Sequence, residues 1–346
     1  MRILFLGGSV FLGRAFVQEA LARGHDVTVF NRGRSGPDLP GVEAVRGDRQ
    51  SAADLAALVE RAPGPERAWD VVIDTSGQQP HTVAAAARAL REHARHYVFV
   101  SSIHAFVDWP ERPVDESSPL HECAADSPAD LPFSTALKAG CERAVIAEFG
   151  AERSTILNCG LLVGPYENVG RLPWWLERMA RGGRVLAPGR PELPIQLIDA
   201  RDFATFGLDL GERGVGGRFL TTALSGSSSY GELLAACVAA TGSDAELVWV
   251  DDDRLRAAEV TPWSEVPLWF PEFEDGQPTA IWQADARAAA AAGLHCRPLA
   301  ETVRDTWAWL QERGPRDRPY TQGAQGDVIG IDPAKEQRIL AELPAG

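Results

Sequence analysis

A cluster of glycines near the N-terminus has the composition of a phosphate-binding turn. The segment GGSVFLG occupies residues 7–13, after a short apolar run at 2–7 and before a helical pattern of apolar residues at 11–23. Glycine permits a tight turn and lets backbone N–H groups approach a pyrophosphate, to which a helix N-terminus adds about half a positive charge. Its place between strand and helix predicts a dinucleotide site, with a simple packing turn as the alternative.

Basic residues follow the second predicted strand (25–30). Asn31, Arg32 and Arg34 stand where an acidic residue would bind the ribose 2′-hydroxyl of NAD. A guanidinium suits a 2′-phosphate, so this pattern favours NADP(H) over NAD, with a solvated basic turn as the alternative. The full set of predicted cofactor contacts is Gly7, Ser9, Val10, Phe11, Leu12, Asn31, Arg32, Arg34, Asp48, Arg49, Thr75, Ser76, Gly77, Ser101, Lys138 and Asn158.

Alternating strand and helix patterns position these residues. Strands are expected at 2–7, 25–30, 42–45, 70–74, 97–101 and 155–157, and helices at 11–23, 51–61, 82–93 and 135–149. This order predicts an α/β fold, a Rossmann-type doubly wound parallel sheet with a smaller C-terminal α/β substrate domain. We expect a dinucleotide-binding domain over 1–165, completed by about 195–222, a substrate-binding region over 166–320, and a tail over 321–346.

Composition narrows the classes of partner. The 346 residues carry a formal net charge of -14, and the mean hydropathy is -0.15 with a pI near 5.0. The acid excess argues against a nucleic-acid or anionic-membrane surface. No apolar run reaches the length of a spanning helix, and the N-terminus lacks the pattern of a secretory signal. Five scattered cysteines without metal-binding spacing predict free thiols, no metal site and a cytoplasmic protein.

The ordered motifs resemble the extended, atypical branch of the short-chain dehydrogenase/reductase superfamily, which includes NAD(P)-dependent epimerases and dehydratases. The glycine turn is similar to that branch's Gly-Gly-Thr-x-Phe-(Leu/Ile/Phe)-Gly, with Val10 in place of the commoner middle glycine. The other matching segments are FNRGR at 30–34, GDR at 47–49, VIDT at 72–75, VSS at 100–102, GP at 164–165 and QLIDARD at 196–202. The resemblance covers residues 1–310.

One catalytic position departs from this family. The family's Tyr-x-x-x-Lys motif would end at Lys138, but Ser134 stands where the tyrosine belongs. Ser102 matches the family's catalytic serine, and Phe106 replaces the tyrosine that usually follows it. The resemblance implies that Lys138 binds the nicotinamide ribose. The phenol that would protonate a developing alkoxide is missing from the sequence motif, and a serine hydroxyl is a much weaker acid.

Three interpretations of the missing phenol stay open. Another side chain donates the proton, with Ser102 and His104 near the expected site; or the substrate supplies it, for example from a phenol bonded to the ketone; or the protein only binds dinucleotide. The predicted catalytic residues are therefore Ser102, His104, Ser134 and Lys138. His104 could equally be a satisfied structural residue, and Asn158 either a buried polar residue or a nicotinamide contact.

Tryptophans beyond residue 166 suggest a large, flat ligand. Trp174, Trp175, Trp282 and the aromatic segment 263–273 could form a wall or lid, although core packing is the better interpretation of any single Trp. The pattern resembles atypical ketoreductases that tailor aromatic polyketides in antibiotic biosynthesis. We therefore expect an NADPH-dependent ketoreductase with an aromatic small-molecule substrate; the alternatives are an NAD-dependent sugar-nucleotide epimerase or dehydratase and a non-catalytic dinucleotide sensor.

Overall fold

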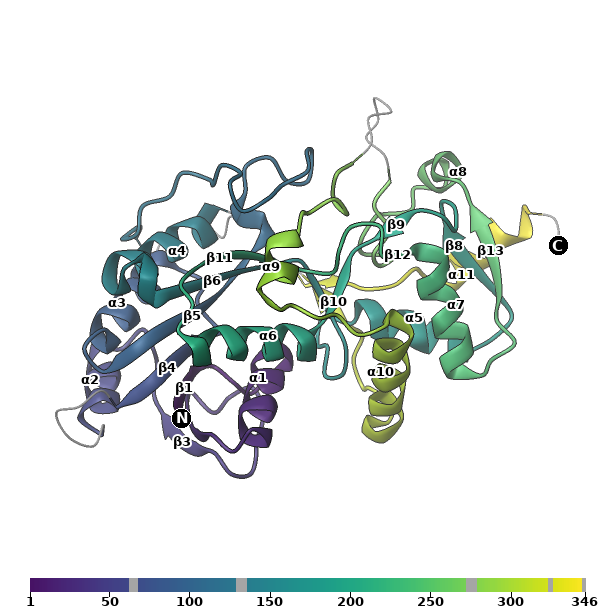
Figure 1. Cartoon of the computed structure of the whole chain (residues 1–346). Coiled ribbons are helices and arrows are strands. Elements are labelled where there is room, and N and C mark those ends of the chain that lie inside the picture. The colour runs from purple at the N-terminus through teal and green to yellow at the C-terminus, as the bar shows by residue number, and fades with distance from the viewer. Residues whose placement is uncertain (62–67, 129–135, 272–278, 323–325, 344–346) are drawn as a thin grey trace.

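The computed structural model describes residues 1–61, 68–128, 136–271, 279–322 and 326–343 (Figure 1). Within them, seven parallel strands form the main sheet in the order β11-β6-β5-β4-β1-β2-β3. Their bounds are β1 (Arg2–Leu6), β2 (Asp26–Asn31), β3 (Glu43–Arg46), β4 (Trp69–Asp74), β5 (Ala94–Ser102), β6 (Ser154–Cys159) and β11 (Gly217–Thr221). The strand order reverses between β1 and β4, which is where such sheets bind ligands.

Helices cover both faces of this sheet (Figure 1). One face packs against α1 (Phe11–Ala22) and α6 (Ala200–Arg213), the other against α2 (Ala52–Glu60), α3 (Pro80–Leu90) and α4 (Ala136–Phe149). Strands buried on both faces need apolar residues throughout, and residues 3–6 of β1 are all at most 1% exposed. The predicted Rossmann-type parallel sheet is confirmed.

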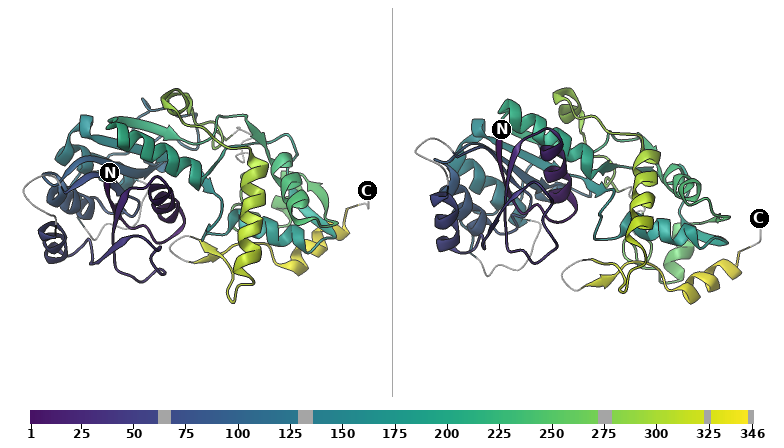
Figure 2. Two further views of the ribbon diagram at one scale, coloured as in Figure 1. Left: turned by 60° about the horizontal axis from the view of Figure 1, so that its bottom comes forward. Right: turned by 90° about the horizontal axis from the view of Figure 1, so that it is seen from below.

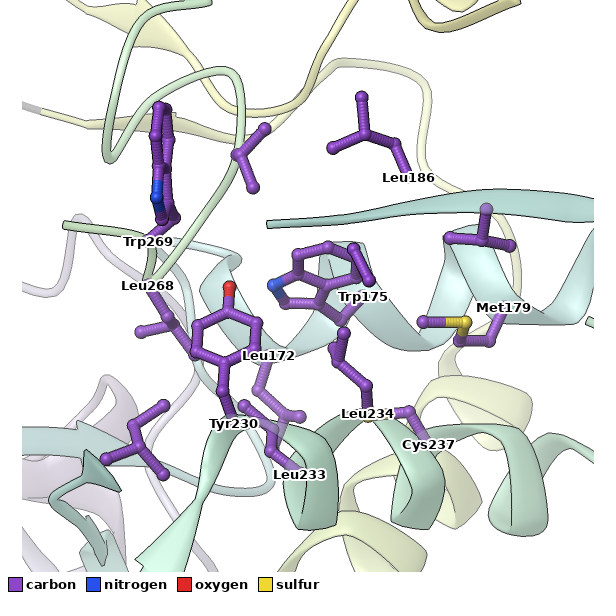
Figure 3. Packing of buried hydrophobic residues seen from close by; sticks show 14 of the residues in the cluster. Leu172, Trp175, Met179, Leu186, Tyr230, Leu233, Leu234, Cys237, Leu268 and Trp269 are labelled. Atoms are coloured by element: carbon purple, nitrogen blue, oxygen red, sulfur yellow. The ribbon is translucent and has the colours of Figure 1, made fainter. Parts of the chain in front are cut away.

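The later chain builds a second hydrophobic core beside the sheet (Figure 2). It consists of α5 (Arg171–Ala180), α7 (Tyr230–Thr241), α8 (Asp252–Ala257), α10 (Leu299–Arg313) and α11 (Pro333–Ala341), with the parallel pair β8 (Arg184–Pro188) and β13 (Glu246–Val250). Figure 3 shows its centre, where the rings of Trp175 and Tyr230 lie edge to face. Their ring centroids are 6.1 Å apart. The short α9 (Arg287–Ala292) returns to the first unit, since Ala289 packs into the core of that unit.

The remaining elements are short. Two-residue and three-residue strands pair as β7 (Leu161–Val163) with β10 (Leu197–Asp199), β9 (Pro194–Ile195) with β12 (Ser228–Ser229), and β14 (Thr321–Gln322) with β15 (Asp327–Val328). The single-turn helices η1 (Ile103–Ala105) and η2 (Ala151–Arg153) follow β5 and α4.

The tail that the sequence leaves without a pattern is an integral part of this second core. Arg178 on α5 forms an ion pair with Glu336 on α11, in which its Nε donates to both carboxylate oxygens at 2.9 Å, and both side chains are under 9% exposed. Ile339 and Leu340 pack beneath them. This arrangement fixes α11 through contacts from distant parts of the chain, which local sequence does not reveal.

Candidate functional site

A cavity of about 600 Å³ opens at the carboxyl ends of β1, β2 and β4. Twelve of the predicted cofactor contacts line it: Gly7, Ser9, Val10, Phe11, Leu12, Asn31, Arg32, Arg34, Asp48, Arg49, Thr75 and Ser76. The cavity therefore lies where the strand order reverses, and its wall is the turn between β1 and α1.

The geometry of that turn fits a pyrophosphate. Gly7 and Gly8 have φ angles of +115° and +100°, which favour glycine. A Cβ at Gly13 would lie 2.9 Å from the backbone nitrogen of Gly8, so α1 approaches the turn more closely than any side chain would allow. The N-cap of α1, Val10, makes no side-chain capping bond, which leaves the first N–H groups for a ligand.

Side chains at the end of β2 organise the rim of the cavity. Asn31 donates to the Ser9 hydroxyl (2.9 Å) and accepts from Arg46 (2.7 Å). Arg46 also pairs with Asp38, and that hydrogen bond lowers the pKa of the Asp38 carboxyl. Asn31 thus orients the glycine turn, and Asp38 and Arg46, which the sequence reasoning missed, neutralise each other.

Arg32 and Arg34 extend from the same rim. Arg32 lies 3.9 Å from Asp48, a loose contact between exposed side chains, and Arg34 is exposed. Arg49 differs, since its guanidinium is committed to the buried carboxylate of Asp74 through two 2.7 Å bonds. Two guanidinium groups are therefore available to a phosphate at this end of the cavity.

We expect Arg34→Ala to lower the affinity for NADP⁺ by roughly tenfold to a hundredfold, and Arg32→Ala to act similarly. A hydrogen bond to a charged group contributes about 1.5–3 kcal/mol, and 1.4 kcal/mol is tenfold in affinity. Titration calorimetry with NADP⁺ and NAD⁺ measures the effect, and NAD⁺ is the internal control because it lacks the 2′-phosphate. An equal loss for both cofactors would contradict a 2′-phosphate site.

Lys138 lies at the other end of the predicted cofactor path. Its ammonium donates to the backbone carbonyls of Gly77 (2.8 Å) and Val100 (2.9 Å) and sits 5.0 Å from the centre of the Phe99 ring. Burial lowers the pKa of Lys138, and the charge of nearby Asp74 opposes that shift. The lysine is thus held at the carboxyl ends of β4 and β5, where a nicotinamide ribose would lie.

A buried polar network supports this end of the sheet. Glu142, one helical turn after Lys138, accepts from Ser101, from Asn158 (2.6 Å) and from Arg218 (2.5 Å). Asn158 also donates to the backbone carbonyl of Ser102 (3.1 Å). Ser101 and Asn158 were predicted as cofactor contacts, but the structure turns their side chains into this network beneath the site. Sequence reasoning missed Glu142, which it could have found only from its spacing to Lys138.

Two of the predicted catalytic residues, Ser102 and His104, lie at the carboxyl end of β5. The Ser102 hydroxyl accepts from the backbone N–H of His104 (3.3 Å), and the His104 ring packs edge-on against Trp109, 4.4 Å between centroids. Desolvation, helped by the charges of Arg171 and His121, lowers the pKa of His104, although its ring reaches solvent. Ser134 lies outside the described residues.

The structure describes all four tyrosines, and each has partners other than Lys138, Ser102 and His104. These partners are Asp74 for Tyr97 (2.9 Å), the Pro267 carbonyl for Tyr230 (2.6 Å), Glu177 for Tyr320 (3.0 Å), and Arg14 and Trp309 for Tyr166.

The aromatic residues of the second core differ in burial. Trp175 and Trp269 are at most 1% exposed and belong to the core in Figure 3, in agreement with the core-packing interpretation of a single Trp. Trp263 is half-buried, 6.3 Å from Trp282 and 5.6 Å from the Arg171 guanidinium. Phe273 lies outside the described residues. Packing between α5 and α7 buries Trp175, whereas Trp263 stays half-buried.

Some cavity residues have no signal in the sequence. Gln79, the N-cap of α3, points a buried side-chain oxygen without a hydrogen-bond partner at the cavity wall. Asn168 reaches the cavity from the later part of the chain. The unpartnered oxygen, the glycine cradle and the free helix terminus together fit a dinucleotide.

Comparisons with known proteins agree with this geometry. Residues 7–127 match a family model described as NAD(P)H-binding. The solved Bordetella bronchiseptica enzyme WbmH in complex with NAD⁺ is similar, with 17% identity, a TM-score of 0.64 and coverage of 91% of this chain and 99% of that one. UDP-glucose 4-epimerase from Thermotoga maritima, solved with UDP-glucose, is 18% identical with a TM-score of 0.63, and the match covers 90% of this chain and 99% of that one. UDP-N-acetylglucosamine 4-epimerase from Bacillus cereus is 16% identical with a TM-score of 0.62, and the match covers 92% of this chain and 99% of that one.

The chain has the Rossmann-type fold of these epimerases. The expected Rossmann-type fold is confirmed, and a nicotinamide dinucleotide is the cofactor class that the matched segment indicates. No curated protein matches the chain. Within the described residues, no cluster of His, Cys, Asp and Glu could hold a metal ion, and no helix is long and apolar enough to cross a membrane.

Proposed function

We propose that the protein is an NADPH-dependent ketoreductase that reduces a bulky aromatic, polyketide-like ketone, as in antibiotic biosynthesis. The observation that supports the proposal is a dinucleotide cavity with two exposed arginines, Arg32 and Arg34, at one end. Beyond the other end, Lys138 makes no hydrogen bond to a tyrosine among the described residues. In this pattern the chain resembles the angucyclinone ketoreductase of simocyclinone biosynthesis. The cofactor, when bound, supplies a hydride to the ketone carbon.

The chain's own residues hold the reactants. Arg32 and Arg34 bind the 2′-phosphate, the glycine turn binds the pyrophosphate, and Lys138 orients the nicotinamide ribose. Ser102 and His104 line the place of the ketone, and Trp263 contributes to the aromatic wall. Because the lowered pKa leaves His104 neutral at pH 7, it is a poor proton donor, which favours a proton from the substrate.

The test is NADPH consumption with a panel of aromatic ketones that carry a hydroxyl next to the carbonyl. We expect turnover with some of these and none with their methyl ethers, whose oxygen has no proton to give. NADPH binding without turnover across the panel would overturn the proposal and favour a dinucleotide sensor. A cytoplasmic location is part of the proposal.

An NAD-dependent sugar-nucleotide epimerase is the second candidate, because the similar solved structures carry that activity in their names. The family's reaction uses the tyrosine that this sequence replaces by Ser134, and the Arg32–Arg34 rim disfavours NAD. Tight NAD that copurifies with the protein, together with binding of a UDP-sugar, would support the epimerase and contradict the reductase.

We predict that the rate of ketone reduction does not rise as pH falls from 8 to 6.5. Desolvation lowers the pKa of His104, so only a small fraction of its rings is protonated in this window. That fraction grows as the pH falls, but the rate does not follow it if the substrate and not His104 supplies the proton. Turnover in His104→Gln should stay within about tenfold of the parent. Loss of a general acid would instead lower turnover by about a hundredfold or more. A rate that climbs with acidity in the parent and loses that climb in His104→Gln would identify His104 as the donor.

A further inference from the structure

Arg171 carries a buried cationic group without a matching acceptor. It is the first residue of α5, and its Nε is buried with no hydrogen-bond partner among the described residues. Its guanidinium lies over the ring of Trp263, 5.6 Å from the centroid. Buried polar groups are nearly always hydrogen-bonded, so the unsatisfied Nε of Arg171 needs an explanation.

Glu167, whose charge acts on Arg171, accepts no hydrogen bond from the Arg171 Nε. Glu167 is fully buried, and its oxygens accept from the backbone N–H groups of Gly170 (3.1 Å), Arg171 (2.7 Å) and Leu172 (3.3 Å). The carboxylate thus caps α5 and leaves the Arg171 side chain without a hydrogen bond. By contrast, the buried guanidinium of Arg178 has its own carboxylate, Glu336.

Two neighbours locate the Arg171 charge at the reacting end of the site. Its positive charge helps to lower the pKa of the His104 ring. Burial raises the pKa of the Cys159 thiol, and the charges of Lys138 and Arg171 both oppose that rise. The Cys159 thiol donates to the backbone carbonyl of Ser101 (3.1 Å), at the carboxyl end of β5. The charges of Arg171 and Lys138 thus both reach the Cys159 thiol at this edge of the sheet, and the Arg171 guanidinium lies over the aromatic ring of Trp263.

We propose that Arg171 binds the oxygen atoms of the substrate on which negative charge develops, and that it selects aromatic ketones with an ionisable hydroxyl next to the carbonyl. This inference rests on the reductase function proposed above. A guanidinium offers parallel N–H donors that match two neighbouring oxygens, which a lysine does not.

The step balances without a protein acid. The ketone carbon receives a hydride from the reduced cofactor, the electron pair of the C=O π bond moves to oxygen, and that oxygen takes the proton of the adjacent phenol. The phenol O–H electron pair stays on its oxygen as phenolate, which Arg171 holds until solvent returns a proton. The ketone is reduced to an alcohol while NADPH is oxidised to NADP⁺, with one proton consumed from solvent.

The test uses 1-hydroxy-2-acetonaphthone as probe and the variants Arg171→Gln and Arg171→Lys. In the complex with NADP⁺ and parent protein, we expect the absorbance titration of the bound phenol to shift to lower pH by about one unit or more, and Arg171→Gln to remove the shift. With NADPH, kcat/KM should fall by about a hundredfold in Arg171→Gln, the size of a lost oxyanion donor, with partial recovery in Arg171→Lys. Arg181→Gln, at the end of the same helix, is the matched control.

The outcomes separate the two proposals. Turnover that stays within threefold in Arg171→Gln, with an unshifted phenol titration in the parent, overturns the role of Arg171 and leaves the reductase standing. A titration shift that depends on Arg171 in a protein that reduces no ketone supports the anion site and overturns the reductase. Loss of NADP⁺ affinity in Arg171→Gln equal to the loss of turnover would also contradict the inference, because it would mean that Arg171 binds cofactor.

Discussion

Gly13→Ala is expected to weaken dinucleotide binding by roughly a hundredfold or more, which corresponds to about 2.8 kcal/mol. The added Cβ would lie 2.9 Å from the nitrogen and 3.0 Å from the Cα of Gly8, and 3.0 Å from the Thr75 hydroxyl. Two of these atoms are backbone and cannot rotate away. The N-terminus of α1 must then move away from the glycine turn. A bound phosphate would lose hydrogen bonds from the backbone N–H groups of the turn and of the helix N-terminus.

Gly24→Ala is the matched control for this prediction. Gly24 directly follows the C-cap of the same helix, its φ is +75°, and a Cβ there meets nothing within 4 Å. Alanine at this position costs about 1 kcal/mol of stability because of the left-handed backbone, without touching the cavity. Calorimetric titration with NADP⁺ and NADPH measures both variants. Unchanged affinity in a folded Gly13→Ala protein would show that the dinucleotide binds elsewhere.

Glu142→Ala is expected to lower the free energy of unfolding by about 3–5 kcal/mol, because one buried carboxylate neutralises a guanidinium and satisfies two other donors. The Glu142 side chain is fully buried and the Arg218 side chain is only 19% exposed. Removing the carboxylate leaves the charge of Arg218 and the donors of Ser101 and Asn158 without their acceptor. Urea denaturation followed by fluorescence measures the loss.

Glu148→Ala, on the same helix, is the control for Glu142→Ala. Glu148 pairs with Arg88 and Arg91, whose side chains are 65% and 48% exposed, so water replaces the carboxylate and the expected cost is below about 1 kcal/mol. Similar losses in the two variants would show that burial of the Glu142 network contributes nothing special. A second readout follows from Asn158, which positions Ser102: turnover should fall in Glu142→Ala even under conditions where the protein stays folded.

The sequence determined the sheet and the phosphate turn because both depend on local chemistry. Apolar runs such as residues 3–6 must be buried on both faces, and the helix after Gly7 and Gly8 needs no distant contact to begin. The basic rim at Arg32 and Arg34 follows directly from its position at the end of β2. These features were predictable since they lie within one strand-turn-helix unit.

Tertiary structure alone decided the rest. Trp175 and Trp263 have the same side chain, but α7 and the Pro267 carbonyl bury the first, and the second remains half-buried beside Arg171. Whether Asn158 faces cofactor or core depended on Glu142 and Arg218 reaching it from α4 and β11. Arg171 stands out only because Glu167 uses its oxygens on the backbone of α5. Such partners are fixed by packing between distant segments, which residue type and spacing do not specify.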